Sequence, residues 1–411
     1  MIKKIKSAIS FLTLLLMLLC CHVGWSCTTV IISGKATKDG RPLLWKNCDT
    51  PNLDQRVYYG SERGYPFIGL MRSNTPNEGR GSIWTGTNSE GFTIMNTLSY
   101  NIVEEYSANN NGFLMRRALE VCKDVASFKH FLDTLSRPMK VSANFGVIDA
   151  NGGAAYFETW DEGYYMNDVN DPAVAPLGYL VYTNFSYNGI YDKGQGYIRY
   201  QTAVEIMAKG APAKAFTPQW IFNNLSRSFY HSLLGVDLSL PQSADLTPNG
   251  WFADSDFIPR KSTATSCVVH GVKPGENPEF TTMWVILGYP PCSVAIPTWV
   301  RLKENQPALL TRTATSENAP ISDWALALKE QVFPIKRGSG EKYFNFGRLY
   351  SHTDQSGFMQ QLAPLEEECF QKEAALMESW RKQGINVKEA QEFHATIFVK
   401  VEKKMQELML R

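Results

Sequence analysis

Short apolar and β-branched runs recur along the first three quarters of the chain, and turn residues separate them. The runs at 27–33 and 42–47 are joined by GKATKDG, and two further pairs of runs flank NSEG at 88–91 and NGG at 151–153. Paired runs around such turns predict β-hairpins. Further strands are expected at 177–184, 265–272, 281–288 and 292–297.

Helical spacing of apolar residues is found in three segments between these runs, at 112–135, 198–210 and 217–229. In the first of them, apolar residues recur every three or four positions, which is the stripe of an amphipathic helix. Strands arranged in hairpins, together with a few long helices, predict an α+β layered fold with antiparallel sheets.

Residues 306–411 have a different pattern, because amphipathic helices dominate them. The helical segments are 321–333, 356–383 and 387–410. Such helices usually pack one face on a core and leave a charged face in water. We therefore expect a core at 27–305 and a helical C-terminal extension at 306–411 that packs on it; a partner-binding or lid role for the extension is the alternative.

The first 26 residues have the layout of a secretory signal peptide. Three lysines in the first six residues precede an apolar run at 11–19, and Gly24 and Ser26 occupy the small-residue positions before a cut after Ser26. A membrane anchor would need roughly 20 apolar residues. We expect export, to the periplasm or beyond the cell, with cleavage before Cys27 and no membrane span afterwards. Lipid attachment at a cysteine near the cut is an alternative, although the residues before each of these cysteines fit such a site poorly.

Composition and motif content limit the kinds of partner that we expect the protein to bind. The chain has 411 residues with 41 Lys+Arg against 40 Asp+Glu, so charge gives no reason to expect nucleic acid or an anionic membrane. No metal-ligand spacing or phosphate-binding loop is present, so neither a metal nor a cofactor is expected. Whether the protein forms a homo-oligomer stays an open question. Six cysteines remain after signal removal, without the dense spacing of a disulfide scaffold: Cys27, Cys48, Cys122, Cys267, Cys292 and Cys369.

The first hairpin brings chemistry to the new N-terminus. If the chain reverses around residue 37, Cys27 lies opposite Asn47, and Lys46 and Asp49 lie close by. The loop leaves this register open by a residue or two. Because side chains alternate along a strand, Cys48 points away from the face that holds Asn47, and we interpret it as a packing residue.

A cysteine at the N-terminus carries its own base. A thiol has a pKa of about 8.5 and an α-amine one of about 7.7–8.0. The amine of Cys27 can therefore take the thiol proton and later pass one to a leaving amine. Lys46 would favour the thiolate by its charge, and Asp49 would orient the ammonium. The structural alternatives are a small buried cysteine, a surface lysine and a turn aspartate before Pro51.

The stretch CTT, DG and WKNCD resembles the N-terminal nucleophile (Ntn) hydrolases. The closest resemblance is to the branch with penicillin V acylase, bile salt hydrolase and acyl-coenzyme A:6-aminopenicillanic acid acyltransferase, and it extends over about residues 27–300. This resemblance implies a four-layer αββα fold. It also implies cleavage of a linear amide C–N bond in a small molecule through an acyl-enzyme, without a cofactor. Water then releases the acyl group, or another amine takes it, as in an acyltransferase.

Three further segments extend the resemblance. TGTNSEGF implies an oxyanion-hole role for Asn88, YTNF implies the same for Asn184, and FIPRKSTATSCVV implies an active-site arginine, Arg260. Amide donors aimed at a developing oxyanion contribute about 3–4 kcal/mol each in favourable sites. The alternatives are a turn asparagine, a strand-end asparagine and an ordinary ion-pair arginine.

One departure from the bile salt hydrolase pattern affects the substrate. Lys46 stands where that group has an arginine, so a compact ammonium replaces a planar guanidinium with its two parallel donors. Activation of the sulfur would survive this change, but bidentate recognition would not. Two alternative functions therefore stay open: a cysteine dipeptidase of the same superfamily, and a non-catalytic exported binding protein that keeps the fold.

Overall fold

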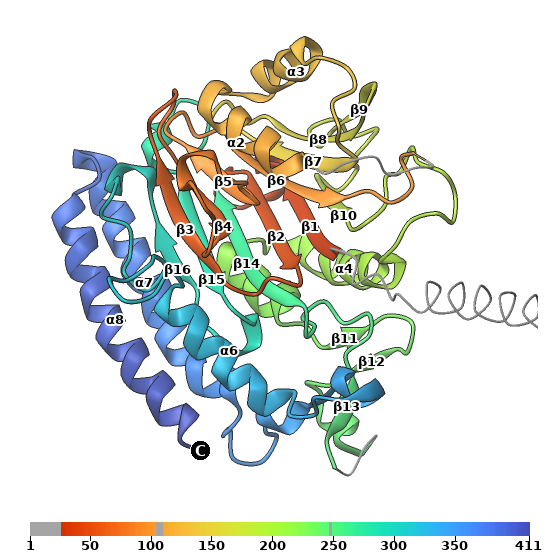
Figure 1. Ribbon diagram of the computed structural model, residues 1–411, viewed down its shortest axis with the longest axis vertical. Helices are drawn as coiled ribbons and strands as arrows, with labels where there is room; N and C mark the ends of the chain where they lie inside the picture. Colours follow the sequence, from red (N-terminus) through yellow and green to blue (C-terminus); the bar gives the residue numbers. More distant parts are fainter. Residues whose placement is uncertain (1–25, 104–109, 246–248) are drawn as a thin grey trace, which may run out of the picture.

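The computed structural model describes residues 26–103, 110–245 and 249–411 (Figure 1). Apart from Ser26, the predicted signal peptide lies outside these residues. Two antiparallel sheets form the centre. The six-stranded sheet has the order β10 (Tyr179–Tyr182), β1 (Ser26–Ile32), β2 (Leu43–Asp49), β14 (Thr263–His270), β15 (Thr282–Leu287) and β16 (Ile296–Thr298).

The seven-stranded sheet is a meander in which each strand pairs with the next along the chain. Its strands are β3 (Gln55–Gly60), β4 (Phe67–Arg72), β5 (Thr85–Asn88), β6 (Thr93–Leu98), β7 (Ala143–Ile148), β8 (Ala154–Trp160) and β9 (Gly163–Asp168). Two short pairs lie outside both sheets: β11 (Tyr230–His231) with β12 (Val236–Asp237), and β13 (Trp251–Ala253) with β17 (Tyr343–Asn345).

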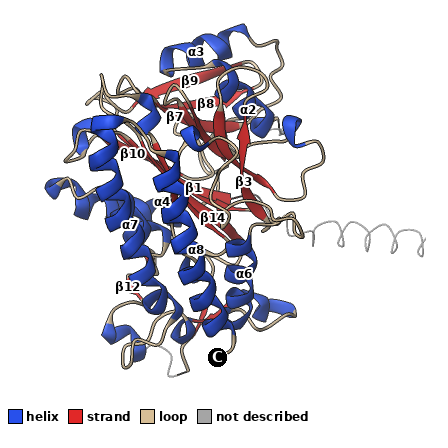
Figure 2. Ribbon diagram, turned by 90° about the vertical axis from the view of Figure 1, so that its left-hand side faces the viewer, coloured by secondary structure: helices blue, strands red, loops and turns tan. Residues whose placement is uncertain are grey.

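Three apolar clusters hold the layers together. The cluster between the sheets includes Ile31 and Leu44 from one and Met95, Ile148 and Tyr156 from the other. Helices α2 (Asn111–Val121) and α3 (Val125–Thr134) cover the outer face of the seven-stranded sheet. Helices α4 (Tyr197–Gly210), α5 (Pro218–Ile221) and α6 (Pro320–Val332) cover the outer face of the other sheet. The layers therefore run helix, sheet, sheet, helix, which confirms the predicted αββα architecture (Figures 1 and 2).

The prediction of a single helix at 112–135 is wrong, because the chain breaks between α2 and α3. Asp124 is the N-cap of α3: its side chain accepts from Ser127 N at 2.7 Å, and Ser127 Oγ accepts from Asp124 N at 2.9 Å. This reciprocal capping box starts a new helix. The predicted helix at 217–229 is likewise shorter, since α5 passes into a π-helical turn at Phe222–Ser226.

The three predicted C-terminal helices are confirmed as α6, α7 (Phe358–Gln383) and α8 (Val387–Met409). They share the apolar core of the six-stranded sheet. The rings of Trp299, after β16, and Trp380, on α7, meet edge-on at 5.1 Å, and His394 Nε2 of α8 bonds to Pro297 O at 2.9 Å. None of the helices in the described part of the chain is long and apolar enough to cross a lipid bilayer.

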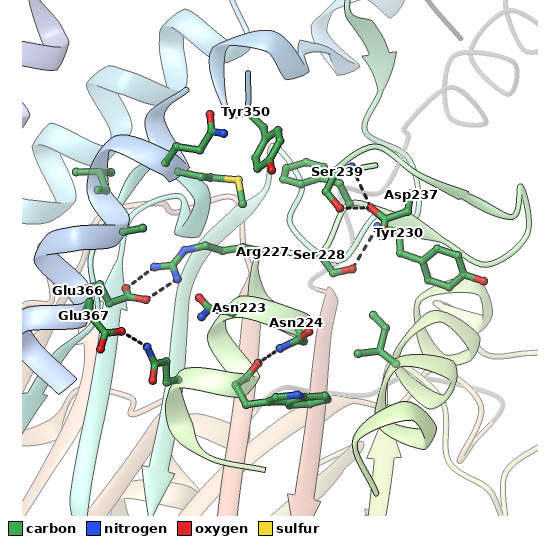
Figure 3. A pocket seen from close by; sticks show the side chains of 18 of the residues that line it. Asn223, Asn224, Arg227, Ser228, Tyr230, Asp237, Ser239, Tyr350, Glu366 and Glu367 are labelled. Carbon is green, nitrogen blue, oxygen red and sulfur yellow. Dashed lines mark hydrogen bonds and ion pairs between the residues drawn. The ribbon is translucent and has the colours of Figure 1, made fainter. Parts of the chain in front are cut away.

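A buried ion pair ties α7 to the core (Figure 3). Arg227, just after the π-helical turn, binds Glu366 of α7 through two bonds, Nη1–Oε1 at 2.7 Å and Nη2–Oε2 at 2.5 Å. Glu366 also accepts from the main-chain N–H of Ala295 at 2.7 Å, and Arg227 Nε donates to Pro290 O. Because every charged group here has a partner, removing one partner leaves the other buried and unpaired.

We predict that Glu366→Gln destabilises the fold by about 3–5 kcal/mol, since it leaves the Arg227 guanidinium buried without its counter-charge. Urea unfolding of the purified variant measures this loss.

The matched control is Glu368→Gln on the same helix. Glu368 pairs with Lys400 on the surface, and an exposed pair contributes about 0–1 kcal/mol. Equal losses in the two variants would contradict the anchoring role of Glu366.

Candidate active site

The pairing of β1 with β2 decides which side chains surround Cys27. Cys27 lies opposite Cys48, and Thr29 lies opposite Lys46. The prediction that Cys27 lies opposite Asn47 is therefore wrong by one residue. A shift of one residue reverses the face on which every side chain lies. Cys48 and Lys46 therefore share the face of Cys27, and the interpretation of Cys48 as a packing residue on the opposite face is corrected.

This face of β1 points toward the seven-stranded sheet. Thr29 Oγ1 accepts a hydrogen bond from Tyr156 OH of β8 at 3.0 Å, and Ile31 belongs to the cluster between the sheets. The sulfur of Cys27 is thus placed at the start of β1 on its inter-sheet side. The thiol is buried: Cys27 exposes 5% of its surface.

Two side chains, those of Asn184 after β10 and of Arg199 on α4, bind the main chain of Cys27. Its N–H donates to Asn184 Oδ1 at 3.0 Å, and its carbonyl accepts from Arg199 Nη1 of α4 at 2.7 Å. Asn184 Oδ1 also accepts from Ser26 Oγ at 2.9 Å and from Arg199 Nη2 at 3.0 Å. The carbonyl oxygen of Asn184, rather than its amide nitrogen, therefore faces the nitrogen of Cys27. The nitrogen of Asn184 donates to Leu98 O, and the oxyanion-hole role implied for Asn184 stays a prediction.

Lys46 is buried between the sheets, with 2% of its surface exposed. Its ammonium donates to Asn96 Oδ1 of β6 at 2.9 Å and to Trp84 O at 3.0 Å. These bonds fix a full positive charge on the same strand face as Cys27. A lysine held this deeply acts on its neighbours by charge more than by contact with a ligand.

Asp49 ends β2 beside this cluster. Its carboxylate is bound by the guanidinium of Arg260 and by Thr263 Oγ1 of β14, the latter at 2.6 Å. The structure therefore brings Asp49 and Arg260 together as an ion pair. In this structure the acceptor for the residue 27 nitrogen is Asn184 Oδ1, and the expectation that Asp49 orients the ammonium of a cleaved chain stays a prediction.

The pKa of the Cys27 thiol is lowered to about 6. The hydrogen bond from Cys48 is the main cause, and the charge of Lys46 and the main-chain N–H of Asp49 add to it against burial and the Asp49 carboxylate. The pKa of Cys48 is raised, first by its interaction with the Cys27 sulfur and then by burial. Burial raises the pKa of the four remaining described cysteines, Cys122, Cys267, Cys292 and Cys369. Among the six, Cys27 is the one poised as a thiolate near neutral pH.

Asn88 does not join this cluster. Both hydrogens of its amide bond to carbonyls at the end of α2, Leu119 O at 2.8 Å and Cys122 O at 2.7 Å. Its Oδ1 accepts from the turn nitrogens of Glu90 and Phe92. The amide of Asn88 therefore does not face Cys27 in this structure, and its implied oxyanion role stays a prediction. Its structural alternative, a hairpin-turn asparagine, describes it, with the added function of binding the helix end.

We call Cys27, Lys46, Cys48, Asp49, Asn184, Arg199 and Arg260 the Cys27 group. Sequence reasoning missed two of them. The correct register would have revealed Cys48. Arg199 occupies a position in a helix with no local signal, although its guanidinium is buried and reaches both Cys27 and Asn184. Burial lowers the pKa of Arg199 to about 10, so it stays charged at neutral pH.

No group of three or more His, Cys, Asp and Glu side chains within the described ranges could hold a metal ion. A cavity of about 980 Å³ lies between α4, α5 and α7 (Figure 3), lined by Trp220, Asn224 and Tyr350 among others. None of the Cys27 group lines it. The cavity is therefore separate from the cysteine chemistry.

The chain resembles known proteins in one region above all. Residues 36–203 match the model of the acyl-coenzyme A:6-aminopenicillanic acid acyl-transferase family. This match confirms the resemblance stated above over less than half of the chain. It includes Lys46, Asp49, Asn184 and Arg199 and begins after Cys27. No curated protein matches the chain.

Several solved structures are similar at low identity. An N-acylethanolamine-hydrolyzing acid amidase ortholog from Caenorhabditis elegans shares 16% identity, with 61% of this chain and 93% of that one covered and a TM-score of 0.39. A variant of the conjugated bile acid hydrolase from Clostridium perfringens shares 12%, with 67% and 93% covered and a TM-score of 0.37. The penicillin V acylase from Agrobacterium tumefaciens shares 11%, with 66% and 86% covered and a TM-score of 0.33.

We predict that alkylation of Cys27 by iodoacetamide rises between about pH 5 and 7 and then levels off, because the thiolate reacts and the pKa is about 6. Cys48→Ala removes the main cause of the lowered pKa, so the rise should move to higher pH. Peptide mass spectrometry at each pH measures the labelling.

Cys267→Ala is the matched control. Cys267 lies on β14 opposite Lys46 and makes no bond to Cys27, so its removal should leave the pH profile in place. A profile that is the same in wild type and Cys48→Ala would contradict the hydrogen bond between the two cysteines.

Proposed function

We propose that this chain is an exported amidohydrolase that uses Cys27 as an N-terminal nucleophile to cleave linear amide C–N bonds through an acyl-enzyme. The main observation that supports the proposal is the environment of Cys27. Its sulfur has a lowered pKa, and its nitrogen is held at 3.0 Å by Asn184 Oδ1. The match of residues 36–203 to an acyl-transferase family supports transfer of an acyl group as the underlying chemistry.

Cleavage after Ser26 creates the catalyst in this proposal. While Ser26 is attached, the nitrogen of Cys27 is an amide and cannot act as a base. Once it is an amine, it takes the thiol proton, and the thiolate attacks the carbonyl carbon of the amide substrate. The ammonium then gives its proton to the leaving amine as the C–N bond breaks. Water hydrolyses the thioester, with the amine as base, and releases the acid.

The Cys27 group supplies position and charge to these steps. Asn184 Oδ1, itself fixed by Arg199, accepts a hydrogen bond from the new amine and aims its lone pair at the sulfur. The ammonium of Lys46 favours the thiolate. Arg260 pairs with Asp49 and so offsets the charge of the carboxylate, which raises the pKa of the thiol. These are positioning and electrostatic roles, whereas Cys27 alone forms the covalent bond.

The burial of Lys46 limits what this residue can contribute to substrate recognition. Its ammonium is occupied by Asn96 and Trp84 O and exposes almost no surface. In this proposal Lys46 acts on the sulfur and does not recognise the substrate, so the acyl group is selected by other residues. We therefore propose an N-acyl amide as the substrate class and do not transfer the substrates of the similar enzymes.

We predict that protein beginning at Cys27 hydrolyses N-acyl amides and that Cys27→Ala abolishes turnover with little change in melting temperature. Protein that keeps Ser26 should be inactive, because its residue 27 nitrogen is not basic. Mass spectrometry of the first residue, together with assays of a panel of N-acyl amides, dipeptides and acyl acceptors, measures these outcomes.

The panel separates the alternatives. Turnover of dipeptides alone would favour a dipeptidase, and transfer to an added amine would favour an acyltransferase. Activity in Cys27→Ala would rule out this nucleophile. A mechanism-based electrophile that leaves Cys27 unlabelled in correctly processed protein would favour a binding protein.

The two asparagines provide a second prediction. Asn184→Ala removes the acceptor for the amine and should lower kcat by about 10²-fold or more, the size of a general-base contribution. Asn184→Asp keeps an acceptor next to Arg199 and should retain more activity.

Asn88→Ala is the control for this pair. It breaks four hydrogen bonds of the hairpin and α2, three of them buried, so it should lower the melting temperature while folded protein keeps its kcat. Steady-state kinetics and thermal unfolding of the three variants test this. Loss of kcat in folded Asn88→Ala, with Asn184→Ala unaffected, would overturn the assignment.

A further inference from the structure

Cys27 and Cys48 form a cross-strand pair of a particular kind. The N–H and carbonyl of Cys27 bond to Asn184 and Arg199, on the side of β1 away from β2. The two cysteines are therefore a non-hydrogen-bonded pair, in which opposing Cα atoms are about 4.5 Å apart and side chains lie closest. A disulfide requires Cα atoms about 4.4–6.8 Å apart. The backbone thus holds two free thiols in a position that a disulfide can join.

The two thiols also differ in reactivity. Lys46 lies on the same face and places a positive charge near Cys27, and the neighbouring Cys48 thiol also lowers the pKa of Cys27. Cys27 is therefore the stronger nucleophile, and Cys48 keeps its proton. Both residues have a little exposed surface, 5% and 8%. Cys267, on the same sheet, lies opposite Lys46 and Val285 and has no cysteine across from it on either neighbouring strand.

We propose that Cys48 is a resolving thiol for Cys27, so that a hydroperoxide converts the pair reversibly into a Cys27–Cys48 disulfide. No hydrogen-bond rearrangement of the main chain is needed, because the pair already lies side by side. This proposal concerns a modification of the Cys27 group, and it rests on the proposed function only for its effect on activity.

The reaction balances with hydrogen peroxide as the oxidant. The Cys27 thiolate attacks one oxygen, the O–O bond breaks, and a sulfenic acid and hydroxide form. The Cys48 sulfur then attacks the sulfenic sulfur, the S–S bond forms as the S–O bond breaks, and the Cys48 proton leaves with that oxygen as water. The hydroxide takes up the proton that Cys27 had released. The two thiols lose two electrons in total, and peroxide becomes two waters.

The disulfide has two consequences for the chemistry. While it exists, the sulfur of Cys27 cannot attack a carbonyl, so amide cleavage stops. It also protects the nucleophile, because a sulfenic acid without a resolving thiol is oxidised further to sulfinic and sulfonic acids, which thiol reductants do not reverse. Export to an oxidising compartment would favour the disulfide, and activity there would then depend on a reductant.

The test is peroxide treatment of purified protein, followed by alkylation of free thiols and peptide mapping without reduction. We expect a linked peptide that contains Cys27 and Cys48, a mass loss of about 2 Da for the pair, and return of both thiols with dithiothreitol. Peroxide-treated protein in which Cys27 and Cys48 are never linked would overturn the proposal. This readout does not use turnover, so it stands whether or not the amidase proposal holds.

The variants Cys48→Ser and Cys267→Ser sharpen the test. In Cys48→Ser we expect Cys27 to gain two or three oxygens that dithiothreitol does not remove, while Cys267→Ser should form the 27–48 link as wild type does. Reversible oxidation of Cys27 in Cys48→Ser, or loss of the link in Cys267→Ser, would contradict the assignment. Should Cys48→Ser fail to fold, the mapping of wild type alone decides. Where amidase activity is measurable, it should fall and recover with the link.

Discussion

The register between β1 and β2 is the constraint on which the candidate site depends. Both neighbours of β2 fix it: Cys48 lies opposite Cys27 on β1 and Thr265 on β14. Packing leaves no other choice, because Leu44 fills the layer between the sheets and Trp45 bonds to Ser226 and Ser266 on the opposite face. A shift of one residue would exchange these two side chains, moving an indole N–H into an apolar layer.

The same register concentrates positive charge around one sulfur. Within the Cys27 group, three cationic side chains, Lys46, Arg199 and Arg260, accompany one carboxylate, that of Asp49. Burying three cations is costly unless each is bonded, and carbonyls, hydroxyls and the carboxylate provide those bonds. The excess of positive charge makes a thiolate the ion that best completes the group. The same setting makes Cys27 a good nucleophile toward a carbonyl and toward a peroxide.

The C-terminal helices support this arrangement from a distance. The Arg227–Glu366 pair and the contact of Trp299 with Trp380 fix α7 on the outer face of the six-stranded sheet. That face also carries α4, which positions Arg199 beside Cys27 and Asn184. The extension thus belongs to the same apolar core as the strand that begins with the nucleophile, and it contributes no side chain to the Cys27 group.

Local patterns in the sequence determined most of the elements and two of the charged neighbours of Cys27. Hairpin turns, amphipathic stripes and the motif WKNCD depend on residues close in the chain, so the strands β1 and β2, the helices α6 to α8, Lys46 and Asp49 could be predicted. Only the tertiary structure decided the rest. The seven-residue turn predicted between the first two strands does not fix their register to one residue. Nothing local indicates that Arg199 reaches Cys27 from α4. Nor does a local pattern show that the carbonyls of Leu119 and Cys122 accept hydrogen bonds from the amide of Asn88. These outcomes depend on packing between segments far apart in the sequence.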